Sequence, residues 1–199
     1  MIIKVCGLSG NYTAREVNTL PKVAYLGFIF FEGSKRYTET SLATAKKKVG
    51  VFVNAPPEYV IAHIEKHGLD AVQLHGSESP DYIRQLPEDV GIIKAFGIAS
   101  EADLEKTGAY EGLADYFLFD TKSDQHGGTG AAFDWEILKN YTGNTPFLLS
   151  GGIGNDSVGA LKAFSHPKLA GYDLNSRFET APKIKDAALI DRFINEMKL

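Results

Sequence analysis

Short apolar runs recur along the whole chain, and polar segments separate them. Eight runs are rich in Val, Ile, Phe and Leu: residues 2–6, 23–30, 49–53, 70–74, 91–96, 115–120, 145–150 and 169–174. Most of them lack the polar alternation of a strand with one exposed face, so they resemble strands that are covered on both faces. The pattern therefore predicts eight buried strands.

Segments with helical spacing lie between these strands. In residues 56–67, Val60, Ile61 and Ile64 fall at helical spacing, and two prolines suit the first turn. Helices are also expected over residues 79–86, 133–141, 156–164 and 187–197. Strand–helix alternation with short connections predicts a single-domain α/β protein, a (β/α)8 TIM barrel over residues 1–199. An open doubly wound sheet is the alternative, but no GxGxxG loop follows the first strand.

Composition excludes several classes of partner. The chain has 199 residues and a formal charge of -4, whereas a nucleic-acid or anionic-membrane surface needs clustered positive charge. We interpret the basic run at residues 46–48 as a helix end, where cations complement the helix dipole. The one cysteine, Cys6, indicates a reducing compartment, and the first residues lack the apolar stretch of a signal peptide. A cytoplasmic protein is expected.

Polar residues stand at the ends of most predicted strands. They are Cys6, Asn54, His75, Asp120, Ser150, Asp173 and Asn175, and Arg36 lies in the loop after the second strand. The active site of a (β/α)8 barrel lies at the carboxyl ends of its strands, so these residues would form one ring. Lys4 has the strand parity of Cys6 and would point inward below it, where a buried lysine needs a carboxylate partner.

Two loops are candidates for phosphate binding. Gly151 and Gly152 follow the seventh strand, and Asn175 and Ser176 follow the eighth. In phosphate-binding barrels these two loops hold the anion with backbone N–H groups, which glycine allows to approach closely. A third glycine run, residues 127–130, could be a mobile lid or an ordinary exposed loop.

Motifs along nearly the whole chain resemble those of the phosphoribosylanthranilate isomerase family. The segments that carry the resemblance are KVCGL (4–8), GFIF (27–30), SKR (34–36), VGVFVN (49–54), VQLHG (72–76), FD (119–120), GGTG (127–130), FDW (133–135) and SGGI (150–153). VQLHG and GGTG-x-x-FDW are specific in combination. Two positions depart from the family pattern. Lys35 replaces the usual Pro, and Arg177 replaces a Gly and would either contact the phosphate or point to solvent.

The resemblance implies an Amadori rearrangement of an aminoaldose to an aminoketose in tryptophan biosynthesis. One acid and one base suffice for this reaction, so neither a metal nor another cofactor is expected. By resemblance, Asp120 is the acid and Cys6 is the base. Burial would have to raise the aspartate pKa from about 3.9, and only a thiolate can accept a proton. The alternatives are a small buried apolar residue at Cys6 and a turn or N-cap residue at Asp120.

The resemblance also implies roles in substrate binding. Arg36 would pair with the anthranilate carboxylate, and its alternative is a surface charge. Asp173 would orient the substrate amino group or hydroxyls, or make a structural hydrogen bond at a strand end. His75 would shape the pocket or be a core histidine. The expected partner is a small phosphosugar, and both a monomer and a homodimer stay open.

Other functions on the same barrel remain as alternatives. Indole-glycerol-phosphate synthase needs a catalytic lysine and glutamate, and histidine-pathway aminoaldose isomerases typically use two aspartates. A non-catalytic phosphate-ligand-binding barrel would be expected to have lost the acid or the base, whereas this chain has both Cys6 and Asp120.

Overall fold

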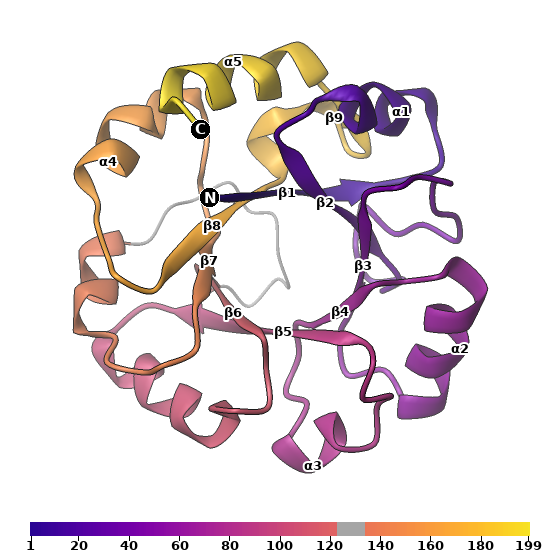
Figure 1. Ribbon diagram of the computed structural model, residues 1–199, viewed down its shortest axis with the longest axis vertical. Helices are drawn as coiled ribbons and strands as arrows, with labels where there is room; N and C mark the ends of the chain where they lie inside the picture. Colours follow the sequence, from indigo (N-terminus) through magenta and orange to yellow (C-terminus); the bar gives the residue numbers. More distant parts are fainter. Residues whose placement is uncertain (123–133) are drawn as a thin grey trace.

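Eight parallel strands close into a barrel. The structure, a computed structural model, describes residues 1–122 and 134–199. The strands are β1 (Ile2–Leu8), β2 (Val23–Ile29), β3 (Lys47–Phe52), β4 (Ala71–Leu74), β5 (Gly91–Ile98), β6 (Tyr116–Thr121), β7 (Phe147–Leu149) and β8 (Leu169–Leu174). Each strand pairs with the next in the chain, and β8 pairs back with β1. Figure 1 shows the helices as an outer ring around this barrel, which confirms the predicted (β/α)8 fold.

The outer ring mixes α-helices with 3-10 helices. The α-helices are α1 (Tyr12–Thr19), α2 (Pro57–His67), α3 (Pro80–Ile83), α4 (Val158–Ala163) and α5 (Ala187–Met197). The 3-10 helices are η1 (Glu101–Tyr110), η2 (Trp135–Asn140), η3 (Asn155–Ser157) and η4 (Ser176–Phe178). A hairpin of β9 (Glu179–Ala181) and β10 (Ile184–Lys185) precedes α5. The sequence pattern did not predict α1, η1 or this hairpin. No helix within residues 1–122 and 134–199 is long and apolar enough to cross a membrane.

The basic run at residues 46–48 was wrongly interpreted as a helix end, because it leads into β3. Lys46 Nζ donates a hydrogen bond to the carbonyl of Leu20, just after α1, at 2.7 Å. Lys48 Nζ donates to the carbonyl of His67, the last residue of α2. The lysines therefore do meet helix C-termini, where cations are favoured, but on two other helices.

Most of the buried apolar side chains among the described residues belong to two clusters. The larger one lies mainly between the strands and the outer ring. The smaller one is made of Val49, Ile93, Ala95, Leu118 and Leu148, which face the barrel interior. Side chains alternate along a strand, so the next inward positions beyond Leu118 and Leu148 are Asp120 and Ser150. Both of these residues are polar.

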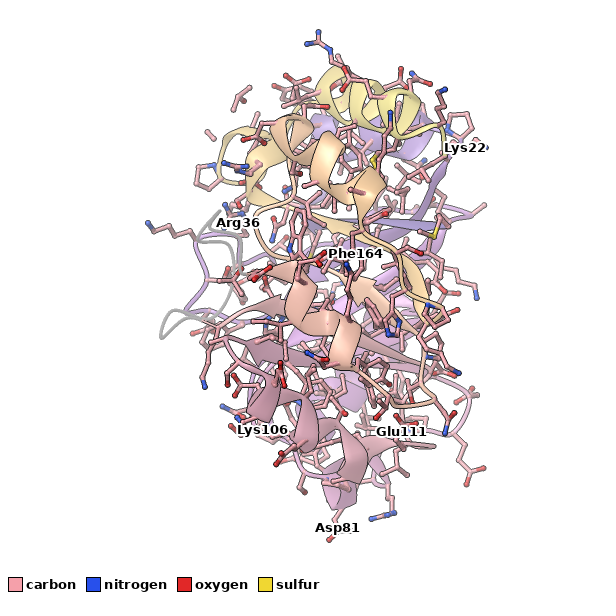
Figure 2. The ribbon with its side chains drawn as sticks, turned by 90° about the vertical axis from the view of Figure 1, so that its left-hand side faces the viewer. Lys22, Arg36, Asp81, Lys106, Glu111 and Phe164 are labelled. Carbon is pink, nitrogen blue, oxygen red and sulfur yellow. The ribbon has the colours of Figure 1, made fainter. Side chains whose placement is uncertain are left out.

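The two ends of the barrel can be told apart in Figure 2. Arg36 follows β2 and Lys22 precedes it, and Figure 2 shows Arg36 on the left side of the molecule and Lys22 on the right side, at opposite ends of the barrel. The carboxyl ends of the parallel strands therefore open at the end where Arg36 lies.

Candidate active site

Four of the predicted site residues come from the carboxyl ends of different strands. Cys6 lies on β1, Asp120 on β6 and Asp173 on β8, and His75 directly follows β4. The carboxyl ends of parallel barrel strands meet at one opening, so the fold brings these four residues to the same end of the molecule.

A buried ion pair lies beneath this opening. Lys4 and Asp173 are direct partners in the pairing of β1 with β8, and Lys4 Nζ lies 2.8 Å from Asp173 Oδ1. Burial lowers the pKa of Lys4, but Asp173 and Cys6 outweigh this effect, so the pKa is raised and Lys4 stays charged. Burial raises the pKa of Asp173, and the Lys4 ammonium opposes this rise. The carboxylate partner expected for Lys4 is confirmed.

Cys6 lies one inward position beyond Lys4 on β1. Its side chain clusters with Ile29 and Val51 and is 2% exposed. A Cβ at Gly27 of the neighbouring strand would lie 2.9 Å from Cys6 Sγ, so the close approach of these strands requires glycine at that position. Burial raises the pKa of the Cys6 thiol above its ordinary value, and the Lys4 ammonium opposes this rise. A base at this position therefore depends on nearby positive charge.

Asp120 belongs to a strand rather than to a helix N-cap. Its Oδ1 accepts a hydrogen bond from the backbone N–H of Thr121 at 2.8 Å. Burial raises the pKa of the Asp120 carboxyl, while the Thr121 N–H, Lys4 and the Ser150 hydroxyl act in the opposite direction. The net rise is the direction that a general acid needs at neutral pH.

His75 lies between a glutamine and the Asp120 carboxyl. Gln73 Nε2 lies 2.8 Å from His75 Nδ1. His75 Nε2 is 3.5 Å from Asp120 Oδ2. Burial, followed by the charge of Lys4, lowers the pKa of His75 to about 4, so the ring is neutral at neutral pH.

Arg36 is half of a partly buried ion pair rather than a free surface charge. Its Nε lies 3.0 and 2.9 Å from the two carboxylate oxygens of Glu179, and its Nη2 lies 2.7 Å from Oε2. Lys185 Nζ donates to Glu179 Oε1 at 2.7 Å, and burial lowers the pKa of Lys185 to about 8. Two cations share one carboxylate, so this cluster has a net positive charge at neutral pH that favours an anionic ligand group.

The loops after β7 and β8 are joined by a side chain. Gly151 and Gly152 have φ angles of 80° and 67°, and a Cβ at Gly151 would lie 2.4 Å from Thr121 Oγ1. Arg177 Nη1 donates to the carbonyl of Gly152 at 3.1 Å and to the Asp156 carboxylate at 2.8 and 2.9 Å. Arg177 therefore links the two candidate phosphate loops.

The remaining candidate phosphate residues lie between β8 and the hairpin. Asn175 Oδ1 accepts a hydrogen bond from Lys185 Nζ at 2.9 Å, and Ser176 is the first residue of η4. The glycine run at 127–130, considered above as a lid, lies outside the described residues.

Sequence reasoning missed three residues that hold the site together. Gln73 lies inside VQLHG and Glu179 lies two residues beyond Arg177, so both were visible in the sequence but had no assigned role. Lys185 comes from the unpredicted β9–β10 hairpin, and only the folded chain brings it to Asn175 and Glu179.

Comparison with known proteins agrees with this geometry. The family model described as N-(5'phosphoribosyl)anthranilate (PRA) isomerase matches residues 3–196. An N-(5'-phosphoribosyl)anthranilate isomerase of Parabacteroides distasonis is 47% identical, over 99% of this chain and 93% of that protein.

Solved structures of the same family are also similar. The phosphoribosyl anthranilate isomerase of Thermotoga maritima has a TM-score of 0.85 and 32% identity, over 100% of this chain and 99% of the other. Another such isomerase was solved in complex with reduced 1-(o-carboxyphenylamino)-1-deoxyribulose 5-phosphate. It has a TM-score of 0.80 and 29% identity, over 100% and 99% of the two chains. The chain therefore belongs to the N-(5'-phosphoribosyl)anthranilate isomerase family.

Proposed function

We propose that this chain isomerises N-(5'-phosphoribosyl)anthranilate to 1-(2-carboxyphenylamino)-1-deoxyribulose 5-phosphate in tryptophan biosynthesis. One observation carries the proposal: a buried thiol, Cys6, and a buried carboxyl, Asp120, lie on strands that end at one barrel opening, and both interact with Lys4. This arrangement offers one base and one acid to a single substrate.

Asp120 is the general acid of the proposed reaction. Opening the furanose ring requires a proton on the ring oxygen, and the raised pKa of the buried Asp120 carboxyl supports this role. Cys6, as the thiolate, then removes a proton from sugar C2 of the iminium, and the resulting enolamine tautomerises to the ketone. One acid and one base are sufficient for these steps, so we propose that the reaction uses neither a metal nor an organic cofactor.

The substrate groups have separate proposed sites. Arg36 binds the anthranilate carboxylate, supported by the net positive cluster with Glu179 and Lys185. Asp173 orients the substrate amino group or hydroxyls, and His75 shapes the pocket next to Asp120. Gly151, Gly152, Asn175 and Ser176 bind the phosphate, and the link through Arg177 supports this assignment.

The domain organisation, compartment and oligomeric state of the enzyme are also proposed. We propose that residues 1–199 act as a single catalytic domain in the cytoplasm, as a monomer or a homodimer, with a small phosphosugar as the ligand. The closed barrel supports the proposal that residues 1–199 form a single domain. Sedimentation equilibrium would separate the monomer from the dimer.

Loss of substrate fluorescence on addition of purified protein tests the proposed activity. We expect Cys6→Ser and Asp120→Asn each to lower kcat by at least about 100-fold, as is typical when general acid or base help is lost. Near-wild-type turnover in either variant would remove that residue from the mechanism. No fluorescence loss with the wild-type protein would contradict the proposed reaction itself.

Inorganic phosphate tests the two loops. We expect it to compete with substrate, raising the apparent KM without lowering kcat, because it would occupy the site of the substrate phosphate. An apparent KM that does not respond to phosphate would argue against the loop assignment.

A further inference from the structure

Lys4 is enclosed in the barrel at a point where it meets the candidate catalytic groups. Its side chain is 0% exposed, and its hydrogen bond to Asp173 Oδ1 is 2.8 Å long. Its ammonium also interacts with Cys6, and its charge reaches Asp120 and His75. A structural ion pair alone would not require this cation to lie directly below the thiol.

Three charged groups act on Cys6 from the elements around it. Lys4 lies on the same strand, Asp173 on β8 and Lys185 on β10. Lys185 is already bound to Glu179 and to the carbonyl and side chain of Asn175. Lys4 has the largest effect of the three, and Asp173 acts on the thiol with the opposite sign.

We propose that Lys4 is a positioning residue that stabilises the thiolate form of Cys6, and that Asp173 limits this effect by sharing the Lys4 ammonium. The proposal rests on the proposed function in one respect only, namely that Cys6 is the base. A buried thiolate is costly unless a cation lies beside it, and Lys4 supplies one at a fixed position. When substrate groups bind Asp173, they withdraw that carboxylate from Lys4, and more of the positive field acts on Cys6.

The proposal predicts effects of opposite sign for the two partners. Lys4→Met removes the cation, and the unpaired Asp173 then takes up a proton. The net effect is a loss of thiolate, because Lys4 acts on Cys6 more strongly than Asp173 does. Asp173→Asn keeps the ammonium and removes its anion, so Cys6 becomes the anionic partner of Lys4. A role in packing alone would not produce opposite signs.

Cys6 is the one cysteine of the chain, so its titration can be followed without ambiguity. The protein is labelled with 13Cβ-cysteine, and the single resonance is titrated with pH, with no substrate present. We expect Lys4→Met to lower the thiolate fraction at a fixed pH below the thiol pKa by about tenfold, one pKa unit, and Asp173→Asn to raise it severalfold. Lys94→Met is the matched control, because it also removes a buried lysine from a buried carboxylate partner, here Glu78 at 3.0 Å. It should change the thiolate fraction less than about twofold.

Circular dichroism checks that each variant is folded across the titration. If Lys4→Met does not fold, Asp173→Asn decides the question alone, because it retains Lys4. An unchanged titration, or a shift of both variants in the same direction, would overturn the proposal. The titration needs no turnover, so it can fail while the isomerase activity is confirmed, or succeed when that activity is absent. In active protein, the acidic limb of kcat/KM should move with the thiol titration.

Discussion

At the scale of single residues, the planar fork of Arg36 allows it to bind two carboxylates. Glu179 occupies the edge formed by Nε and Nη2 and leaves Nη1 on the other side of the guanidinium. A lysine at this position would have one ammonium, which would contact Glu179 and leave no second N–H edge for another carboxylate. The geometry of Arg36 therefore matters as much as its charge.

Arg36→Lys tests this argument. We expect the KM for phosphoribosylanthranilate to rise about tenfold while kcat changes less than about threefold, because the variant would lose the proposed contact with the anthranilate carboxylate, which lies outside the reacting atoms. Steady-state kinetics measures both constants. Arg84→Lys, on an exposed ion pair with Asp81, is the control and should change neither constant. An unchanged KM in Arg36→Lys would show that a single positive charge is sufficient.

Strand parity explains why part of the site could be predicted from the sequence. Cys6, Asp120 and Asp173 share the inward parity near strand ends, and that alone brings them to one opening. The contacts among them depend on the register between strands, which a single strand does not encode. Lys4 was expected to have a carboxylate partner, but the pairing of β1 with β8 determines that the partner is Asp173.

At the scale of elements, the strands were more predictable than the helices. Each buried strand is a continuous apolar run, whereas α1 (Tyr12–Thr19) is short and mostly polar and buries only Thr13, Ala14 and Val17. The expected helix at residues 133–141 is a 3-10 helix over Trp135–Asn140 in its described part. The β9–β10 hairpin is too short to produce an apolar run, so its contribution to the site could not be foreseen.

The close approach of β1 and β2 gives a prediction at this scale. Gly27→Ala would place a methyl group 3.0 Å from Cys6 Cα as well as against its sulfur, and two neighbouring strands have little room to separate. We expect the free energy of unfolding to fall by about 1–3 kcal/mol, the usual cost of overpacking. Urea denaturation measures it. Gly159→Ala in α4 is the matched control, because no atom lies within 4 Å of the added methyl group, and its stability should stay equal or rise. Equal stability in both variants would contradict the argument.

At the scale of the whole molecule, the neutral His75 makes folding depend on pH. Its pKa is lowered from 6.5 to about 4 by burial, so between these values the unfolded chain binds a proton that the folded chain does not. Stability should therefore fall as the pH decreases from 6.5 to about 4, with a total contribution of about 3 kcal/mol.

His75→Gln separates this contribution from the other acid effects. Glutamine does not titrate, so the variant should lose less stability than the wild-type protein between pH 7 and pH 4.5. Chemical denaturation at the two pH values gives the comparison. Identical losses in the two proteins would show that His75 does not titrate between those pH values during unfolding.

The pairing of Lys4 with Asp173 has a consequence for how activity is acquired during synthesis. These residues belong to the first and the last barrel strands, 169 positions apart in the chain. A nascent polypeptide therefore cannot close the barrel, or assemble the proposed site from β1, β6 and β8, until its final strand has emerged and docked against its first. Enzyme turnover can therefore be used to detect closure of the barrel. Truncated or stalled chains that lack the last strand would be inactive rather than partly active.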